Sequence, residues 1–288
     1  TAGGLSRQHT TQVRGMTTKP PPRILTIAGS DSSGGAGIQA DIKTIIMLGG
    51  YAMSAITAIT AQNTRGVQGV TPLTGDFVAE QIESCLSDIG ADAIKIGMLH
   101  DADIIGEVAK LLATLPEARD VPIILDPVMV ATSGGRLLQE DAVEIMREKL
   151  FPLATLITPN LPELAILAGS DLNDSDAIIQ AAVALAEDSD AWVLAKGGHT
   201  EDARVIDFLV SADGFHMQFD DPRIPTRHTH GTGCTLSAAI ATLVGHGQPL
   251  HHAIRLARQF TRAAIESAPG FGDGSGPLGH QAVRKLEG

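Results

Sequence analysis

The sequence is poor in the features that mark several common classes of protein. Cysteine occurs only twice in 288 residues, as Cys85 and Cys234, which excludes a disulfide framework, and no Cys/His cluster has the spacing of a zinc site. So low a cysteine count is typical of a reducing compartment, and we expect a cytoplasmic protein. The sequence also has no run of 18 apolar residues, so it predicts no membrane-spanning helix.

Basic residues are in deficit as well. The chain has 21 lysines and arginines against 33 aspartates and glutamates, which gives a formal net charge of −12. A field of that sign repels nucleic-acid phosphates and anionic lipid headgroups, so we expect neither nucleic acid nor a membrane surface as a partner. An anionic small molecule would need a locally positive pocket. Hydrophobic residues make up 43% of the chain and charged residues 19%, a balance typical of a folded domain with a large core.

The N-terminal segment differs in composition from the rest of the chain. Residues 1–22 contain three basic residues and no acidic ones, and they end in Pro20-Pro21-Pro22. We predict that residues 1–22 are a disordered leader or a cloning remnant outside the fold, with a transit-peptide remnant as the weaker alternative. The length and composition of residues 23–288 are those of one large α/β domain.

From Arg23 onward, short apolar strands alternate with segments of helical periodicity, which predicts a mostly parallel sheet covered by helices on both faces. Residues 205–210 and 215–219 instead flank a Ser-Ala-Asp-Gly turn and predict an antiparallel hairpin near the sheet edge. We expect the Gly/Pro-rich residues 269–279 to form a surface loop. The expected strands are 24–28, 52–60, 93–97, 123–126, 156–158 and 192–195, and the expected helices include 232–245 and 250–267.

Ligands of such sheets bind beyond the carboxyl ends of the strands, and this sequence has unusual residues there. The strongest motif is Gly231-Thr232-Gly233, which follows His230 and opens an apolar helix. Two glycines allow a tight turn with exposed N–H groups, and the helix start adds the positive end of its dipole, so the motif favours an anion hole for a phosphoryl group. An ordinary helix-capping turn is an equally good interpretation of the motif alone.

Cys234 lies in the first turn of the same helix, a position that lowers the pKa of a thiol from its usual ~8.5. A thiolate there could accept the proton of an attacking hydroxyl group. The alternative is a small buried hydrophobic residue, the usual state of a free cysteine, and position alone favours that alternative.

Two further segments follow the first and second predicted strands. Residues 29–37 form a Gly/Ser loop whose glycine spacing fits neither a dinucleotide fingerprint nor a P-loop, so the loop indicates a small ligand close to the backbone. Asp41, one turn into the next helix, could reach that ligand or be a solvated helix carboxylate. Gln62 carries an amide suited to the edge of an aminopyrimidine, although a polar turn is favoured without other context.

The remaining strand ends carry acids and a lysine. Asp126 ends one strand, and Asn160 and Glu163 follow another; carboxylates so placed suit Mg²⁺, which binds a few carboxylates together with waters and phosphates. Glu163 could instead be a plain first-turn helix acid. Lys196, followed by two glycines, either meets a phosphate or is a snorkelling surface lysine. Six strand ends with phosphate-, metal- or base-compatible groups are hard to attribute to chance.

With these motifs in view, the sequence from about Ile24 to Ala268 resembles the hydroxymethylpyrimidine/phosphomethylpyrimidine kinases of the ribokinase-like superfamily. The resemblance implies a ribokinase-like three-layer α/β sandwich without a separate lid domain. It also implies ATP, Mg²⁺, a homodimer, and two successive phosphorylations, of a hydroxymethylpyrimidine and then of its monophosphate. The segments that carry the resemblance, highly specific as a set, are LTIAGSDSSGGAGIQADIKT, TAITAQNTRGV, IKIGML, LITPNLPE, KGGH and HGTGCTLSAAIA.

The resemblance also implies roles for single residues. Gly231, Thr232 and Gly233 would form the anion hole. Cys234 takes the place where many ribokinase-like enzymes have an aspartate base, so a catalytic role for it is now favoured, and His230 would position the loop. The other implied roles are pyrimidine binding by Gln62, Asp41, the Gly29 backbone and Met98, nucleotide binding by Lys196, Thr158 and Asp126, and magnesium binding by Asn160 and Glu163.

Three rival functions stay open. Some pyridoxal kinases on the same scaffold have a second cysteine in the loop after residues 126–129, and residues 130–134 here contain none, which favours the pyrimidine but leaves pyridoxal as a side substrate. A nucleotide- or pyrimidine-binding module without catalysis is disfavoured by the intact phosphate and metal motifs. A sugar kinase is disfavoured by cysteine rather than aspartate at position 234 and by Gln62.

Overall fold

The computed structural model describes residues 20–129, 138, 140–198 and 202–283. The predicted leader lies outside these residues except for its three prolines, and so does the loop 130–134. Pro22 already belongs to the fold, because its carbonyl oxygen accepts a hydrogen bond from the Tyr51 N–H at 2.8 Å. The folded part of the chain therefore begins slightly before the predicted boundary.

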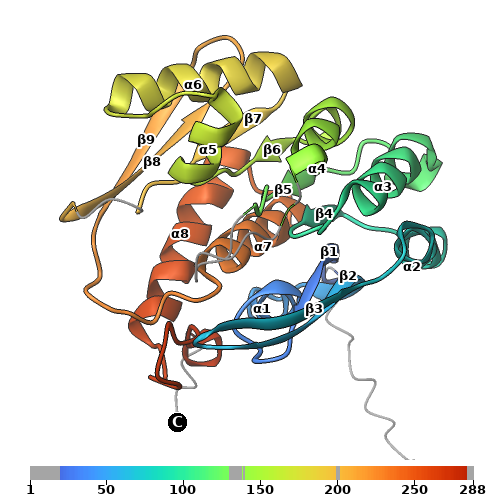
Figure 1. Ribbon diagram of the computed structural model, residues 1–288, viewed down its shortest axis with the longest axis horizontal. Helices are drawn as coiled ribbons and strands as arrows, with labels where there is room; N and C mark the ends of the chain where they lie inside the picture. The colour runs from blue at the N-terminus through green and yellow to red at the C-terminus, as the bar shows by residue number, and fades with distance from the viewer. Residues whose placement is uncertain (1–19, 130–137, 139, 199–201, 284–288) are drawn as a thin grey trace, which may run out of the picture.

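One sheet forms the middle of the molecule (Figure 1). Its strands are β1 (Arg23–Asp31), β2 (Tyr51–Asn63), β3 (Gly66–Pro72), β4 (Ala93–Ile96), β5 (Ile123–Leu125), β6 (Leu156–Ile157), β7 (Trp192–Ala195), β8 (Arg204–Val210) and β9 (His216–Pro222). Within the described residues the order is β3-β2-β1-β4-β5-β6-β7-β8-β9. Neighbours from β2 to β7 are parallel, β3 is antiparallel to β2, and β8 and β9 continue antiparallel beyond β7. The predicted parallel sheet with an antiparallel hairpin at its edge is confirmed.

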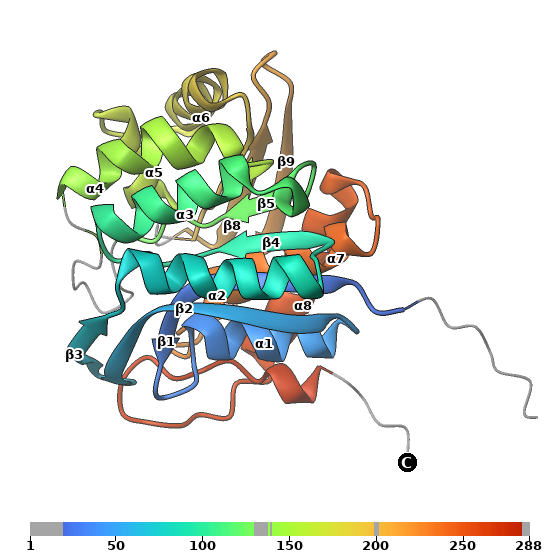
Figure 2. The ribbon, with the colours of Figure 1, turned by 90° about the vertical axis from the view of Figure 1, so that its right-hand side faces the viewer.

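Helices cover both faces of the sheet and complete the predicted three layers. They are α1 (Gly37–Met47), α2 (Gly75–Asp88), α3 (Ala102–Thr114), α4 (Glu140–Ile145), α5 (Leu161–Ala168), α6 (Ser175–Ser189), α7 (Thr232–Gly245) and α8 (Leu250–Glu266), with short helical turns η1 (Pro116–Ala118), η2 (Met146–Leu150), η3 (Phe151–Leu153) and η4 (His280–Ala282). Helices α1, α7 and α8 form one layer, and α2 to α6 form the other (Figures 1 and 2). Among the described residues, no helix has the length and apolar character needed to cross a membrane.

Neighbouring residues of the central strands point to opposite layers. In β1, Ile24 packs in the cluster under α7 and α8, and Leu25 packs in the cluster under α2 and α3. Ile124 and Leu125 of β5 divide in the same way, and all four side chains are at most 1% exposed. The short apolar runs that predicted these strands are thus buried on both faces, as parallel strands between two helical layers must be.

The sequence pattern does not predict β3. This strand begins with a glycine, ends with a proline and has another glycine in its middle, and most of its residues are exposed, so no apolar alternation marks it. Antiparallel pairing with β2 holds it in place. The β2–β3 hairpin extends the same sheet, so it adds no separate lid domain.

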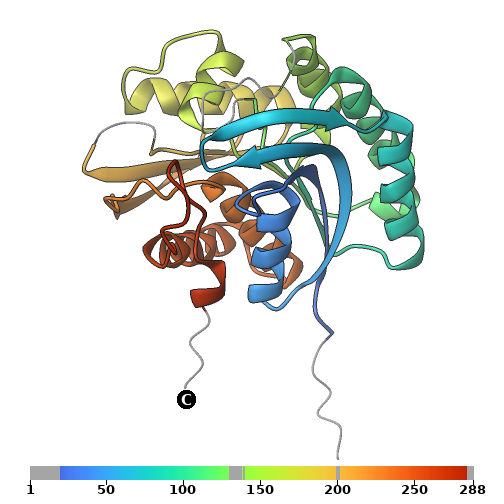
Figure 3. The same ribbon diagram turned by 60° about the horizontal axis from the view of Figure 1, so that its bottom comes forward.

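The segment after α8 is more than the predicted surface loop. Leu278 is 3% exposed, and the Gly279 N–H donates to the Ala264 carbonyl at 2.8 Å. The His230 N–H donates to the Gly276 carbonyl at 3.1 Å. Figure 3 shows this segment running beside α1. It therefore supports the turn before α7, a role that its Gly/Pro-rich composition does not indicate.

Candidate active site

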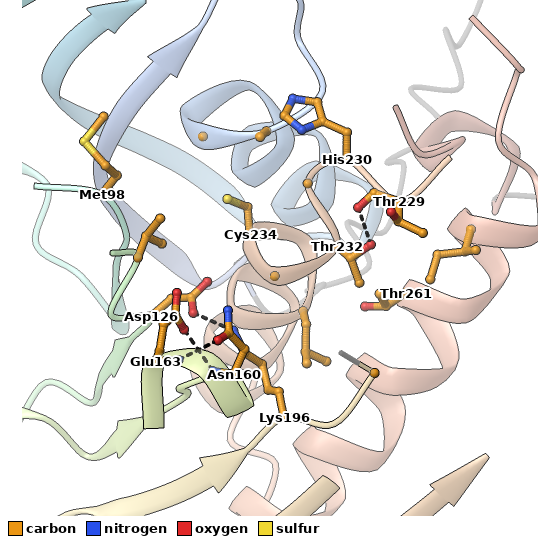
Figure 4. Close-up of a pocket in the computed structure, with 18 of the residues that line it drawn as sticks. Met98, Asp126, Asn160, Glu163, Lys196, Thr229, His230, Thr232, Cys234 and Thr261 are labelled. Carbon is orange, nitrogen blue, oxygen red and sulfur yellow. Dashed lines mark hydrogen bonds and ion pairs between the residues drawn. The ribbon is translucent and has the colours of Figure 1, made fainter. Parts of the chain in front are cut away.

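The carboxyl ends of the parallel strands open into one cavity of about 630 Å³, as expected for this kind of sheet. Two of the predicted site residues, Asp41 and Thr158, lie behind its wall. Figure 4 shows several of the others facing the same space. The predicted residues that line the cavity are Gly29, Gln62, Met98, Asp126, Asn160, Glu163, Lys196, Gly231, Thr232, Gly233 and Cys234.

The turn before α7 has the shape that an anion hole requires. Gly231 caps the helix with φ 85°, a left-handed conformation, and a Cβ there would overlap the Gly35 carbonyl oxygen, so only glycine fits. Thr232 Oγ1 donates to the Thr229 carbonyl at 2.7 Å and fixes the turn. Gly231 to Cys234 all line the cavity, which puts the positive end of the helix dipole at its wall.

Lys196 and Asp126 form an ion pair next to that turn. Lys196 Nζ lies 2.6 Å from Asp126 Oδ1, and Thr158 Oγ1 donates to the same oxygen at 3.2 Å. Burial alone would lower the pKa of Lys196, but Asp126 and Glu163 raise it overall, so the side chain stays a cation. A Cβ on Gly233 would lie 3.4 Å from Lys196 Nζ. The lysine therefore stands next to the first turn of α7, held by Asp126, while Thr158 orients the aspartate.

Asn160 and Glu163 form a capping box at the start of α5. Asn160 Oδ1 accepts from the Glu163 N–H, and Glu163 Oε2 accepts from the Asn160 N–H, each at 2.9 Å. Burial raises the pKa of Glu163 to about 7; Lys196 opposes this shift and Asp126 adds to it. The capping box uses Glu163 Oε2. The other oxygen, Oε1, has only a long contact of 3.5 Å with the Met129 N–H, so it is the oxygen best placed to bind a ligand.

Cys234 lies where the N-termini of α1 and α7 meet. Its sulfur accepts a hydrogen bond from the Gly37 N–H, and the half-buried side chain lines the cavity. The prediction that the helix start lowers the thiol pKa is wrong for the free protein. Burial raises the pKa of Cys234 to about 11, because Lys95 and the Gly37 N–H oppose only part of that shift. Cys234 is therefore a thiol at neutral pH.

Asp31 organises the Gly/Ser loop, a role that the sequence analysis missed. Its carboxylate accepts hydrogen bonds from the N–H groups of Ser33, Gly35 and Ala36 at 2.8 to 3.1 Å. His230 Nε2 lies 2.8 Å from the same carboxylate. His230, expected to position the loop, thus ties the turn before α7 to the loop after β1. An aspartate followed by serines and glycines is a signal for such a side-chain turn and could have indicated it.

Replacing Asp31 by asparagine should lower the free energy of unfolding at neutral pH. It should also make that free energy less dependent on pH in the acidic range. Burial would raise the pKa of this carboxyl, but hydrogen bonds from His230 and Ser33 outweigh burial and lower the pKa from 3.8 to about 2. A lowered carboxyl pKa contributes stability above the unfolded value, and this contribution is lost as pH falls through the folded value. Urea midpoints of wild type and Asp31→Asn should therefore differ at pH 7 and converge toward pH 2. A difference that does not change with pH would contradict this account.

The predicted pyrimidine-binding residues gather beside the Gly/Ser loop. Gly29 and Met98 are in close contact, because a Cβ on Gly29 would overlap the Met98 side chain. Gln62 is anchored at one side of its amide, since Oε1 accepts from Thr60 Oγ1 at 3.1 Å, and its side chain lines the cavity. These three residues line the part of the cavity next to the Gly/Ser loop.

Asp41 does not face that space. The side chain is fully buried, and its Oδ2 accepts from Thr26 Oγ1 at 2.6 Å and lies 2.8 Å from Lys95 Nζ. The expected contact between Asp41 and a pyrimidine is therefore missing from this geometry. The reason is that α1 packs on the sheet with Asp41 toward a lysine of β4, and a lysine inside an apolar strand is not a usual partner to predict.

Arg223 and Thr261 line the cavity together with Lys196, and neither was predicted from the sequence. Arg223 Nη1 donates to the Gly198 carbonyl at 3.1 Å. Within the described part of the chain, Arg223 Nη2 and Thr261 Oγ1 are buried and have no hydrogen-bond partner. Buried polar atoms are normally paired, so these two are suited to a polar ligand. No motif marks them, because one follows an edge strand and the other lies inside a regular helix.

Comparison with known proteins agrees with the geometry. The sequence model of the phosphomethylpyrimidine kinase family matches residues 31–279. The hydroxymethylpyrimidine/phosphomethylpyrimidine kinase of Bacillus subtilis is 45% identical over 91% of this chain and 96% of its own length. The solved phosphomethylpyrimidine kinase of Clostridium difficile has a TM-score of 0.74 at 38% identity, covering 85% of this chain and 99% of that one. A pyridoxal kinase of B. subtilis, solved as an ADP complex, has a TM-score of 0.82 at 36% identity, covering 91% and 98%.

Some relatives are much longer than this chain. It spans 53% of the bifunctional thiamine biosynthesis protein ThiED of Geobacter sulfurreducens and 36% of the multifunctional ThiED of Corynebacterium efficiens, at 46% and 47% identity. The match in both cases covers more than nine-tenths of this chain. The cavity and its lining residues therefore correspond to one part of these longer proteins.

Proposed function

Because the chain belongs to the phosphomethylpyrimidine kinase family, we propose that it transfers the γ-phosphoryl group of ATP to 4-amino-5-hydroxymethyl-2-methylpyrimidine and then to the resulting monophosphate, as a step of thiamine biosynthesis. The observation that carries the proposal is the meeting of the first turn of α7, Lys196 and Cys234 at one cavity. A helix N-terminus and a lysine suit a phosphoryl group in transfer, and the thiol adjoins the space for the acceptor.

The pyrimidine would lie between the Gly/Ser loop and β4. Met98 and the Gly29 backbone offer a flat surface, and the anchored amide of Gln62 offers a donor and an acceptor to the aminopyrimidine edge. Cys234 adjoins the same space, since its sulfur bonds to the Gly37 N–H at the end of that loop. The hydroxymethyl group would then point from the ring toward the start of α7.

Phosphoryl transfer needs positioning and charge neutralisation more than covalent chemistry. In the first reaction the hydroxymethyl oxygen bonds to the γ-phosphorus, the bond from phosphorus to the β–γ bridging oxygen breaks, and ADP leaves. The hydroxyl proton passes to the thiolate form of Cys234. The N–H groups that open α7, together with Lys196, stabilise the charge on the transferring group. In the second reaction the acceptor is already a phosphate oxygen, so a base matters less.

ATP would lie with its phosphates at Lys196 and its nucleoside toward α8. The unpartnered Arg223 Nη2 and Thr261 Oγ1, found among the described residues, face that end of the cavity and would bind polar atoms of the nucleotide. A related pyridoxal kinase, solved with ADP, supports nucleotide binding in this fold. Asp126 would hold the Lys196 ammonium in place through its 2.6 Å contact.

Mg²⁺ would be held by Glu163, with Asn160 setting the carboxylate orientation through the capping box. The described residues contain no cluster of three His, Cys, Asp or Glu side chains that could bind a metal unaided. Mg²⁺ fits such a site nevertheless, because it takes one or two protein carboxylates and completes its shell with phosphates and waters. When bound, the ion would neutralise phosphate charge.

Replacing Glu163 by glutamine should raise the Mg²⁺ concentration needed for half-maximal activity by about tenfold or more. The amide keeps the shape of the capping box but removes the charge that attracts the ion. Steady-state rates over a magnesium titration would measure this. Asp176→Asn is the matched control, because Asp176 is also a first-turn helix acid but lies on α6, and it should behave as wild type. An unchanged magnesium dependence in Glu163→Gln would remove this residue from the metal site.

A substrate panel with ATP tests the function itself. Hydroxymethylpyrimidine and its monophosphate should both be phosphorylated, and pyridoxal and ribose should react poorly or not at all. Release of ADP that depends on added pyrimidine would also separate a kinase from a binding module without catalysis. Preference for pyridoxal would overturn the proposal. The homodimer and the cytoplasmic location stay predictions from the sequence.

A further inference from the structure

A buried ion pair lies behind the cavity wall, and the phosphoryl transfer described above does not use it. Lys95 Nζ, near the end of β4, lies 2.8 Å from Asp41 Oδ2 on α1, and both side chains are 0% exposed. Removing two charges from water is costly, and apolar side chains of similar volume often serve a core as well or better. The presence of this pair at the centre of the sheet therefore points to a use other than stability.

The pair lies close behind Cys234. The Gly37 N–H donates to the Cys234 sulfur, and Asp41 lies one turn further along α1, on the same face of the helix. The ammonium group of Lys95 lies next to Gly97, because a Cβ on Gly97 would be 2.7 Å from Lys95 Nζ. The carboxylate and the ammonium group are therefore buried behind the half-buried thiol, where α1, α7 and β4 meet.

The charges that act on the thiol come from four elements. They are Lys95 on β4, Asp41 on α1, Asp126 after β5 and Lys196 after β7. After burial, Lys95 has the strongest effect and favours the thiolate, whereas the two aspartates oppose it. Each lysine is paired with a carboxylate, Lys196 with Asp126 at 2.6 Å and Lys95 with Asp41 at 2.8 Å. Lys95 is therefore the main group that makes a thiolate of Cys234 accessible in this buried place.

The geometry of the pair favours its charged form. Asp41 Oδ2 accepts from Thr26 Oγ1 at 2.6 Å as well as from Lys95, and hydrogen bonds to a carboxylate stabilise its charge. Burial alone would lower the pKa of Lys95, but Asp41, Cys234 and Asp126 raise it overall. Burial raises the pKa of Asp41, and its Oδ1 is buried without a hydrogen-bond partner among the described residues, so Lys95 and Thr26 are the groups that favour the charged carboxylate.

We infer that Lys95 is a positioning residue of the reaction, which stabilises the thiolate of Cys234, and that Asp41 holds Lys95 in place and limits this stabilisation. The use of the thiolate in catalysis rests on the proposed function. The effect of the pair on the thiol does not, because it is a property of the free protein. The two members of the pair thus act on the thiol in opposite directions.

Alkylation of Cys234 by iodoacetamide tests the inference without any kinase turnover. The protein would carry Cys85→Ala, so that one thiol remains, and rates would be followed at several pH values without ATP or pyrimidine. Lys95→Met should slow alkylation by about tenfold at a given pH, and Asp41→Asn should accelerate it by about tenfold, because Cys234 then becomes the nearest counter-ion of Lys95. Lys110→Met, which removes an exposed lysine paired with Glu107, is the control and should change nothing.

The alkylation rates of Lys95→Met and Asp41→Asn are expected to change in opposite directions, and this distinguishes an electrostatic role of the pair from a structural one. If the pair only supported the fold, both variants would loosen the site and shift the alkylation rate in the same direction. The double variant Lys95→Met/Asp41→Asn leaves neither member of the pair charged, so it should alkylate more slowly than wild type and no more slowly than Lys95→Met. Equal directions in the two single variants, no change in either, or a fast double variant would each overturn the inference.

Kinase assays of the same variants separate this inference from the proposed function. Lys95→Met should lower kcat for the first phosphorylation more than for the second, with little change in the KM for ATP. If alkylation follows the expected order but the two phosphorylations fall equally, the pair tunes the thiol and Cys234 is not the base. If no pyrimidine is phosphorylated by the wild type, the proposed function fails while the alkylation result stands.

Discussion

Replacing Gly231 by alanine should remove most kinase activity, by about 10²- to 10³-fold in kcat, and leave a folded protein. Gly231 has φ 85°, where an L-residue costs about 1–2 kcal/mol. The new Cβ would also overlap the Gly35 carbonyl, so the start of α7 and the Gly/Ser loop must move apart. The expected loss is that of one misplaced donor to the transferring phosphoryl group.

Gly247→Ala is a matched control at the other end of the same helix. Gly247 has the same φ of 85°, and a Cβ there would meet nothing within 4 Å. This variant should therefore lose stability through backbone strain alone and keep its activity. Thermal unfolding and steady-state rates of both variants would separate the two effects. Equal activity in Gly231→Ala and Gly247→Ala would show that the turn does not hold the transferring group.

The same turn shows how much of the site the sequence can predict. The C-terminal ends of parallel strands meet at one edge of a sheet, so residues that follow different strands can be grouped from their positions in the sequence alone. Lys196, Asp126 and Glu163 line the cavity and were predictable on this ground. The prediction needs only the order of strands and helices, which apolar periodicity indicates well.

Side-chain direction and burial are not predictable in this way. The helical pattern of α1 does not say that Asp41 turns inward, and no local signal says that Lys95 of an apolar strand will be its partner. For Cys234, the helix start favours a low thiol pKa, but burial has the opposite and larger effect and raises the pKa to about 11. Local rules fail at both places because the dominant contribution comes from residues distant in sequence.

Replacing Cys234 by alanine should lower kcat/KM of the first phosphorylation by about 10²- to 10⁴-fold, the usual contribution of a general base. The second phosphorylation should fall much less, because its acceptor is already ionised. Steady-state kinetics with hydroxymethylpyrimidine and with its monophosphate would measure both. Cys85→Ala makes the same change at the other half-buried cysteine, on α2, and should leave both reactions unaffected.

The pH dependence of the first phosphorylation gives a second test of the same role. A base acts in its deprotonated form, and the pKa of Cys234 in the free protein is about 11, so kcat/KM of the wild type should rise by about tenfold per pH unit from neutral to moderately alkaline pH. Cys234→Asp substitutes a much stronger acid, which is already ionised at pH 7, so this rise should flatten in that variant. If Cys234 were only a buried apolar residue, Cys234→Ala would slow both phosphorylations equally and leave the slope of the pH profile unchanged. That pair of results would remove the thiol from the chemistry and leave the anion hole and Lys196 as the groups that act on the phosphoryl.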